Sequence, residues 1–497
     1  MIKRIFTCAA CCIVLLLSGS IASASTPAPA RPTMPGKAFV DIPSDGTVAL
    51  SLADAVLLGL ANNHEIRAAY LDRVAQKTML RMAEERFSPK LTLNGSHVIN
   101  QNQTDRSSRT EFSPTATLQS ETGAHFSLSW NNSVTQDEHG FASRDDGTSL
   151  TVVQPLMRGA GRDIVTAPLK QAWLSDRINH LNLKAIVSDV VTQIIFTYHE
   201  VLRAQEQSRL IQEALARARR SLTYDLYRAA AGYWIESDFT GLVYAEADVA
   251  SRELALEETE SRLDASRQRL LRLLGLEADT QIHVVDALEI RPVKVGVTKA
   301  FAAALVRQPA YLIQHLAAIQ ASVELTVARD QQQWDVSLVG KASQTRNFTP
   351  TAIGGQTSQY RDSYAGIRVG IPIGDATHRQ TEVRARVNAK NQDLRLVDAR
   401  NALKRDIDDG VRDLDARWRQ YVAACRLLEL TRMKLEVERE RMQKFPGDSF
   451  RVLVFESDLY NAESARIDTL IAYRNALATL DKVSGTTLES WEIELND

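Results

Sequence analysis

The chain has 497 residues, of which 44% are hydrophobic and 24% are charged, and its formal net charge is -2. The 59 lysine and arginine residues nearly balance the 61 aspartate and glutamate residues and are interspersed with them. The sequence therefore has no basic stripe of the kind that steers a protein to nucleic acid, and no nucleic-acid partner is expected. Its length is enough for two or three domains.

The first residues have the parts of an export signal. Lys3 and Arg4 supply the positive start, an apolar stretch runs from about Ala9 to Leu17, and Ala22-Ser23-Ala24 fits a signal-peptidase site. We therefore expect residues 1–24 to be a signal peptide.

Cysteine use agrees with export. Cys8, Cys11 and Cys12 lie in the expected signal peptide, which leaves Cys425 as the only mature cysteine and allows no intramolecular disulfide. No later segment reaches about 18 uninterrupted apolar residues, the length of a membrane-spanning helix.

A Pro-rich stretch, residues 25–50, predicts an extended tether. The sequence after it consists of two related copies, at 51–275 and 298–485, with a linker at 276–297 and a tail at 486–497.

A shift of 245 positions relates the two copies. It places Leu60 on Leu305 and Leu93 on Leu338. The shared register of such individually weak matches indicates an internal repeat.

The hydrophobic period changes in the same order in both copies. Helical spacing predicts a helix over residues 51 to 87 and another over 298 to 333. The period then falls to two: Leu91, Leu93 and Gly95 alternate with small polar residues, as do Phe126, Leu128 and Trp130. This alternation predicts two-faced strands of about 9 to 11 residues, and two strands per copy would give each chain four.

Helical spacing then returns over residues 164–231 and 377–444. Helices of nearly 70 residues would measure about 100 Å and indicate coiled coils. Shorter helices are expected at 238–274 and from the break at Pro446-Gly447 to about Val483. The breaks between them, 232–238 and 445–449, would be the turns at one end of a rod whose other end carries the strands.

The strands have a pattern suited to lipid. Lipid requires every backbone group to be paired internally, so two-faced strands of this kind span a membrane only in a closed barrel. Four strands cannot close one, so several chains would have to share it. Trp130, Tyr360 and Tyr364 would suit the aromatic girdle at the membrane interface, although isolated aromatic residues on strands also serve as packing residues.

Several short motifs follow one another in a set order. They are Leu52-Ala53-Asp54-Ala55, Leu60-Ala61-Asn62-Asn63-His64-Glu65-Ile66, Ala83-Glu84 with Pro89 and Leu91, Gln154-Pro155-Leu156-Met157-Arg158-Gly159-Ala160-Gly161, and Leu459-Tyr460-Asn461-Ala462. In these motifs, their order and their duplication, the sequence from about 51 to 485 resembles the TolC-type outer-membrane efflux proteins.

The resemblance implies an α+β membrane protein: a homotrimer whose long antiparallel coiled-coil helices form a periplasmic α-barrel and whose strands form one shared transmembrane β-barrel. It implies an exit duct in the outer membrane, spanning into the periplasm, for a tripartite efflux or type I secretion system. The expected partners are a periplasmic adaptor (membrane fusion) protein, an inner-membrane transporter and outer-membrane lipid. The alternative from another class is a periplasmic coiled-coil scaffold or adaptor without a pore.

The sequence departs from this family at the tip. Some members carry paired aspartates there, whereas residues 451–455 contain no acid. Asp448 and Glu456 lie close by, yet acids near a helix start more often cap it or face solvent.

The middle of the first copy is also longer than that of the second. Residues 115–119 and 125–133, joined by Glu121-Thr122-Gly123, predict an additional hairpin. It would either join the barrel, giving eighteen strands in a trimer, or fold over the extracellular mouth.

No motif indicates catalysis. Gly159-Ala160-Gly161 lacks the third glycine of a phosphate-binding turn, and we expect it to bend the chain from strand into helix. The nine histidines have no metal-ligand spacing. We therefore expect no enzyme, no catalytic residues, no cofactor and no metal site.

Overall fold

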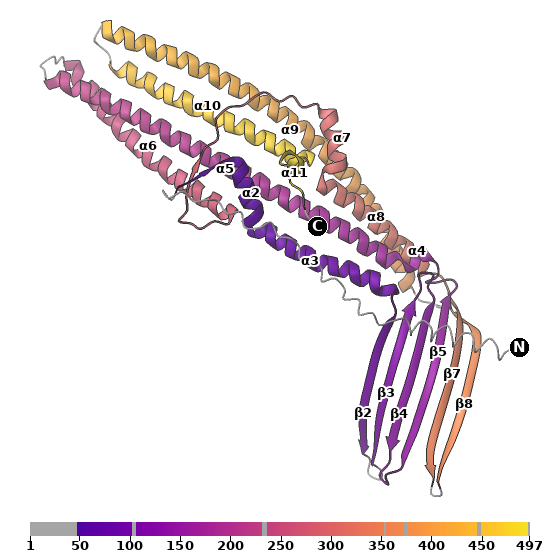
Figure 1. Ribbon diagram of the computed structural model, residues 1–497. Coiled ribbons are helices and arrows are strands. Elements are labelled where there is room, and N and C mark those ends of the chain that lie inside the picture. The colour runs from indigo at the N-terminus through magenta and orange to yellow at the C-terminus, as the bar shows by residue number, and fades with distance from the viewer. Residues whose placement is uncertain are drawn as a thin grey trace.

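The structure is a computed structural model, and it describes residues 47–101, 106–230, 236–351, 354–371, 373, 376–444 and 449–495. In this part of the chain, a rod of long helices carries a sheet of long strands at one end (Figure 1). The expected signal peptide and all but the last four residues of the expected tether lie outside these ranges.

The first expected helix, 51 to 87, is wrong as a single element, because it is broken into α2 (Leu52–Asn62), α3 (His64–Glu84) and a 3-10 turn at Glu85–Phe87. Asn63 causes the break. Its side-chain oxygen accepts hydrogen bonds from the N–H groups of Glu65, at 2.9 Å, and Ile66, at 3.2 Å. Asn63 therefore caps a new helix.

The expected helix over 298–333 is broken in the same way, into α7 (Val297–Arg307) and α8 (Pro309–Asp330). Pro309 is the first residue of α8, where its missing N–H costs nothing. The same ring disfavours helical geometry at the preceding residue, Gln308, which is extended.

The long helices agree closely with expectation. They are α5 (Ala167–Ala230, 64 residues) after the short α4 (Arg162–Val165), α6 (Glu236–Leu274), α9 (Thr377–Lys444, 68 residues) and α10 (Ser449–Ser484). Gly275 ends α6 with a φ of 65°, as expected of a C-terminal glycine. The short α11 (Thr487–Ser490) follows α10.

The core of the rod lies around the middle of α5. Val187, Val190, Ile194, Tyr198 and Val201 are completely buried there. They pack where α5 meets α2, α6 and α10, so the most apolar stretch of the chain is a helix core. A second cluster joins α9 to α7 and α10.

The ends of α5 and α9, and the starts of α6 and α10, lie at the end of the rod far from the sheet (Figure 1). This is where the two expected turns belong. The turns themselves, in 232–238 and 445–449, fall largely outside the described residues.

A small parallel sheet was not expected. It pairs β1 (Thr47–Leu50), at the end of the expected tether, with β6 (Gln281–Val284), inside the expected linker. The expected tail is also packed, because Leu488, Trp491, Ile493 and Leu495 lie against the core.

The large sheet is antiparallel, with the order β2-β3-β4-β5-β7-β8. Its strands are β2 (Lys90–Gln101), β3 (Arg106–Gln119), β4 (His125–Gln136), β5 (Ala142–Pro155), β7 (Asp335–Thr351) and β8 (Gly354–Gly370). The expected strand lengths were wrong, because the backbone ladders continue into segments where polar residues hide the alternation, as at the pair Arg144 and Phe348. The four strands expected from two per copy become six, the number expected if the additional hairpin joins the sheet.

The additional hairpin is in the sheet, as β3 and β4, and not over its end. Its turn, residues 120–124, faces the helices. A Cβ added at Gly123 would lie 2.8 Å from the carbonyl oxygen of Gly159, and Gly123 has a φ of 98°. The turn therefore packs closely on the bend that leads into α4.

Candidate functional site

The register of the large sheet gives it one apolar face. Residues directly opposite each other on antiparallel strands share a face, and Leu128 stands opposite Ala116 on β3 and Leu150 on β5. Followed across all six strands, this face carries Leu91, Leu93, Phe112, Pro114, Ala116, Leu118, Phe126, Leu128, Trp130, Leu150, Val152, Val336, Leu338, Ala342, Ala365, Ile367 and Val369. We call it the apolar face.

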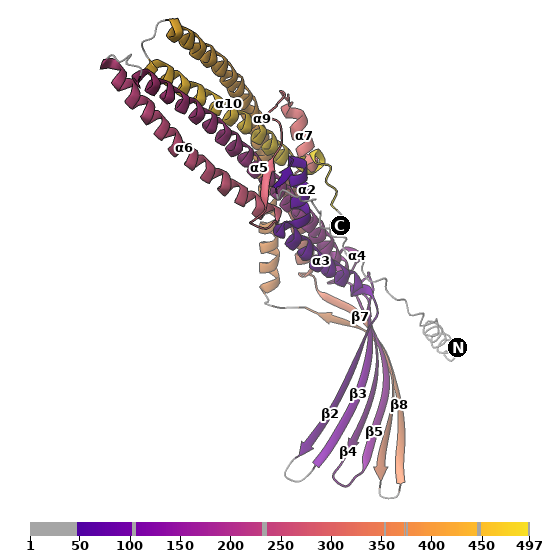
Figure 2. The same cartoon turned by 60° about the vertical axis from the view of Figure 1, so that its left-hand side comes forward.

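The opposite face, here the polar face, consists mainly of serine, threonine and asparagine. Its members include Thr92, Asn94, Ser113, Thr115, Ser127, Ser129, Ser149, Thr151, Ser343 and Thr345. Side chains on it are more enclosed: Ser133 is 4% exposed, whereas Trp130 on the apolar face is 48% exposed. The sheet is curved (Figure 2), and on its four inner strands the side chains of the polar face are mostly half-buried or buried, which assigns this face to the concave side.

The three aromatic residues expected in one girdle do not share a face. Trp130 lies on the apolar face, in the row that ends at Arg361. Tyr360 and Tyr364 stand opposite Thr345 and Lys341, on the polar face. Since neighbours in a strand point to opposite faces, the girdle interpretation fits Trp130 and is wrong for the two tyrosines.

Both outer strands of the sheet are open. β2 and β8 each have one neighbour, and all twelve residues of β2 are exposed. Each edge presents a row of unpaired backbone groups, which natural proteins normally cover or pair.

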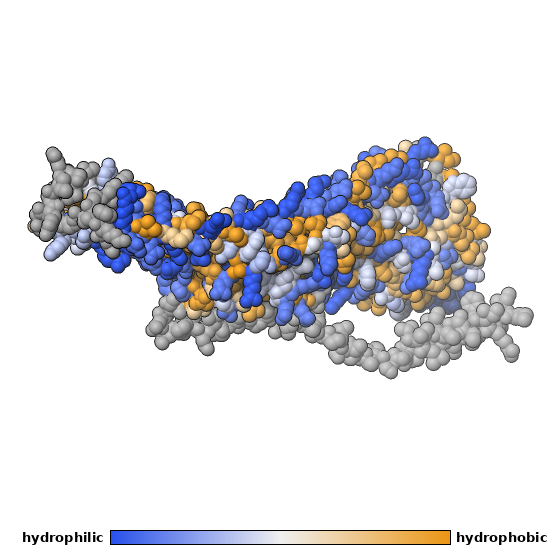
Figure 3. Space-filling model, turned by 90° about the horizontal axis from the view of Figure 1, so that it is seen from above, coloured by the Kyte–Doolittle hydropathy of each residue, from blue (hydrophilic) through white to orange (hydrophobic). Residues whose placement is uncertain are grey.

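The helices that continue these edges also carry uncovered apolar surface. α3 leads into β2, and α9 follows β8. On α9 the exposed apolar residues lie on the side away from the core in two groups. The first is Val383, Val387, Leu394 and Val397, and the second, 25 positions further on, is Val422, Leu427, Leu430, Met433 and Val437. Apolar patches interrupt the hydrophilic surface along the rod (Figure 3). We call these nine residues the α9 stripe.

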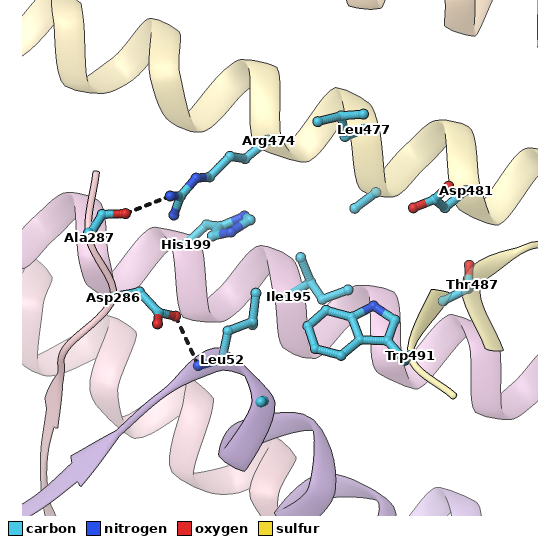
Figure 4. A pocket seen from close by; sticks show the side chains of 12 residues that line it. Leu52, Ile195, His199, Asp286, Ala287, Arg474, Leu477, Asp481, Thr487 and Trp491 are labelled. Carbon is cyan, nitrogen blue, oxygen red and sulfur yellow. Dashed lines mark hydrogen bonds between the residues drawn. The ribbon is translucent and has the colours of Figure 1, made fainter. Parts of the chain in front are cut away.

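A pocket of about 440 Å³ opens in the middle of the rod, between α2, α5, α10, the segment after β6 and the C-terminal segment (Figure 4). Its polar groups form bonds between these segments. Asp286 accepts from the N–H of Leu52 at 2.9 Å, and Arg474 donates to the carbonyl oxygens of Ala287, at 2.6 Å, and Glu289, at 3.0 Å. The pocket thus lies at a structural junction.

Burial in this junction shifts the ionisation of its side chains. It lowers the pKa of His199 to about 4, and the ring Nδ1 lies 2.7 Å from Asn475 Oδ1. The neutral imidazole therefore donates from Nδ1 at neutral pH. Burial also lowers the pKa of Arg474 and raises the pKa of Asp481.

Of the two acids considered at the tip, Asp448 lies outside the described residues. Glu456 is buried, with 6% of its surface exposed. Its Oε1 accepts from Arg439 at 2.8 Å, an ion pair between α9 and α10 of the same chain. This pairing does not suit a gate formed by free carboxylates.

Among the described residues, the helices contain no stretch of the length and hydrophobicity that a membrane span requires. No group of three or more potential metal ligands occurs in the same ranges.

The chain matches solved outer-membrane channels over most of its length. It resembles the CmeC outer membrane channel of Campylobacter jejuni at 14% identity, with a TM-score of 0.65 over 88% of this chain and 86% of that one. It resembles CusC, whose structures concern transmembrane channel formation, at 16% identity and a TM-score of 0.66 over 92% and 99%. The open MtrE outer membrane channel of Neisseria gonorrhoeae matches at 16% identity and a TM-score of 0.64 over 88% and 89%.

No family model and no curated protein matches the sequence. At identities this low, the similarity to these channels is a similarity of fold. The chain has the mostly helical fold with one large sheet of the TolC-type outer-membrane channels, as the sequence resemblance implied.

Proposed function

We propose that the chain is an outer-membrane channel that forms the exit duct of an efflux or type I secretion system. The observation that carries this proposal is the large sheet, which is apolar on its convex face, polar on its concave face and open at both edges. A sheet built in this way fits a segment of a barrel wall, with lipid outside and water inside.

The open edges support assembly of identical chains. A sheet of six strands with β2 and β8 unpaired closes when β8 of one copy pairs with β2 of the next. The α9 stripe continues one of these edges, so the same neighbour would cover it. Three chains would supply eighteen strands and form a homotrimer.

Element lengths support the internal repeat. α2 and α7 both have 11 residues, and their first residues, Leu52 and Val297, are 245 positions apart. The breaks at Asn63 and Gln308 have the same offset. In each copy a broken helix leads into the sheet, a long helix leaves it and a shorter helix returns.

The long helices support a duct across the periplasm. At 1.5 Å per residue, the 64 residues of α5 and the 68 of α9 span about 100 Å. In this proposal the rod reaches from the outer membrane towards a periplasmic adaptor and an inner-membrane transporter, and the duct conducts passively, without chemistry of its own.

A periplasmic scaffold without a pore would also use long coiled coils. Such a scaffold would expose the many large apolar side chains of the convex face to water, which is unfavourable.

Planar-bilayer recording tests the proposal. The purified protein should insert from detergent and give stepwise, ohmic current increments, and analytical ultracentrifugation of the same sample should show a trimer. A stable monomer with intact helix content, or a protein that washes from membranes with salt and gives no current, would favour the scaffold.

A further inference from the structure

The apolar face ends in arginines on the side far from the helices. Arg144 of β5, Arg346 of β7 and Arg361 of β8 all lie on this face. Arg346 stands opposite Asp146 on β5 and Gln359 on β8. Asp146 is two positions from Arg144, and Gln359 is two positions from Arg361. Each arginine is thus diagonal to the next, at about 7 to 8 Å, within reach of long side chains. We call these three residues the arginine cluster.

The three guanidinium groups are free to bind a ligand. All three residues are exposed, and in the described part of the chain none of them forms an ion pair. Asp146 is the one acidic residue that the described strands place on the apolar face. It accepts a hydrogen bond from Trp130 Nε1 at 2.6 Å, so the four charged groups together carry a surplus of positive charge.

The cluster lies at the height where lipid headgroups would begin. Arg346 follows Asp335, the end of β7 nearest the helices, by eleven residues, which is about 36 Å along a strand. A strand tilted by about 40° crosses an apolar band about 25 Å tall in about 33 Å. Counted in the same way through their partners on β7, Arg361 (opposite Gln344) lies about 30 Å from that end and Arg144 (opposite Phe348) about 43 Å. The cluster would therefore straddle the outer edge of the hydrocarbon, on the leaflet away from the rod.

We propose that the arginine cluster binds the phosphate group of an anionic lipid of that leaflet. Guanidinium groups bind phosphate oxygens in pairs, with matched geometry. Beside the cluster, Leu150 and Ala342 lie on the same face towards the helices and offer an apolar surface for the acyl chains. This continuity favours a lipid over free phosphate. The inference rests on the proposed channel function, which turns the apolar face to lipid.

Spin-labelled lipids test the proposal on the assembled protein in phosphatidylcholine vesicles. Lipid next to the protein gives a motionally restricted spectrum. We expect the relative association constant of spin-labelled phosphatidic acid to exceed that of spin-labelled phosphatidylcholine by about two-fold or more, since cationic side chains at a membrane surface attract anionic lipid. The triple variant Arg144→Gln, Arg346→Gln, Arg361→Gln should reduce this ratio to about one.

A matched control removes three cations from the polar face of the same sheet: Arg109→Gln, Lys341→Gln and Arg368→Gln. It should keep the wild-type ratio. Two results would overturn the lipid site while leaving the channel proposal intact. One is the same ratio of association constants in all three proteins, and the other is a fall of the wild-type ratio to about one on addition of millimolar inorganic phosphate. Absence of any restricted lipid would instead overturn the membrane role and the site with it.

Discussion

Asp330, at the end of α8, accepts a hydrogen bond at 2.8 Å from the backbone N–H of Gly159, in the bend between β5 and α4. Gly159 has a φ of 77° and Gly161 a φ of 92°, backbone geometry that favours glycine. The expected role of this Gly-Ala-Gly segment in turning the chain is therefore confirmed. The bond ties the second copy's helix to the first copy's bend, at the junction of rod and sheet.

Asp330→Ala should destabilise this junction. Asp330 is 6% exposed, and its loss would leave a partly buried N–H without its acceptor, at a cost of about 1 to 3 kcal/mol. Thermal unfolding followed by circular dichroism should show a lower Tm.

Asp335→Ala is the matched control. Asp335 pairs with Arg158 at 2.8 Å, but its side chain is 43% exposed, and exposed pairs contribute at most about 1 kcal/mol. Equal effects of the two variants would contradict the junction role of Asp330.

His199 should make stability depend on pH. The unfolded ring takes up a proton near its ordinary pKa of 6.5, whereas the folded ring does so only near a pKa of about 4. The folded state therefore loses stability as the pH falls from about 6.5 to about 4, by up to about 3 kcal/mol.

The comparison with His199→Gln isolates this effect. Buried acids such as Asp330 and Asp481 have raised pKa values and act in the opposite direction, but they are common to both proteins. Denaturant unfolding at pH 4.5 and pH 7 should show a larger drop for wild type. The same drop in both proteins would refute the role of His199.

Leu394→Asn should weaken the trimer. Leu394 is 65% exposed in the α9 stripe, and burial of such a side chain against a neighbour contributes about 1.5 to 3 kcal/mol. Sedimentation at decreasing protein concentration in detergent should show earlier dissociation. Arg395→Asn, one residue along and off the stripe, should behave as wild type, and dissociation unaffected by either change would place the interface elsewhere.

The long helices could be predicted because a single signal, the helical spacing of apolar residues, extends along each of them. From Ala167 to Ala230 the apolar residues keep helical spacing, with Pro168 confined to the first turn. The same holds from Thr377 to Lys444, and both predicted ranges agree with the structure to within a few residues.

The breaks at Asn63 and Gln308 were missed, although each has a signal. Asn63 is a strong N-cap residue and Pro309 a strong first residue of a helix, but the apolar spacing on both sides outweighed them. No local signal predicts the pairing of β1 with β6, because the two four-residue strands are over 200 positions apart.

The register of the large sheet is the part that sequence alone could not supply. Alternation placed Phe126, Leu128 and Trp130 together correctly. It could not relate Trp130 to Tyr360 and Tyr364, nor bring Arg144, Arg346 and Arg361 to one place, because these relations depend on how β5, β7 and β8 align.

In the proposed channel, the convex face of the sheet meets lipid and its concave face meets water. Spin labels at Leu128, on the apolar face, and at Ser129, on the polar face, test it directly in reconstituted membranes. Collision with oxygen reports lipid and collision with a water-soluble nickel complex reports water. We expect high oxygen and low nickel accessibility at residue 128 with the reverse at residue 129. Water exposure at both positions would show that the sheet does not face lipid.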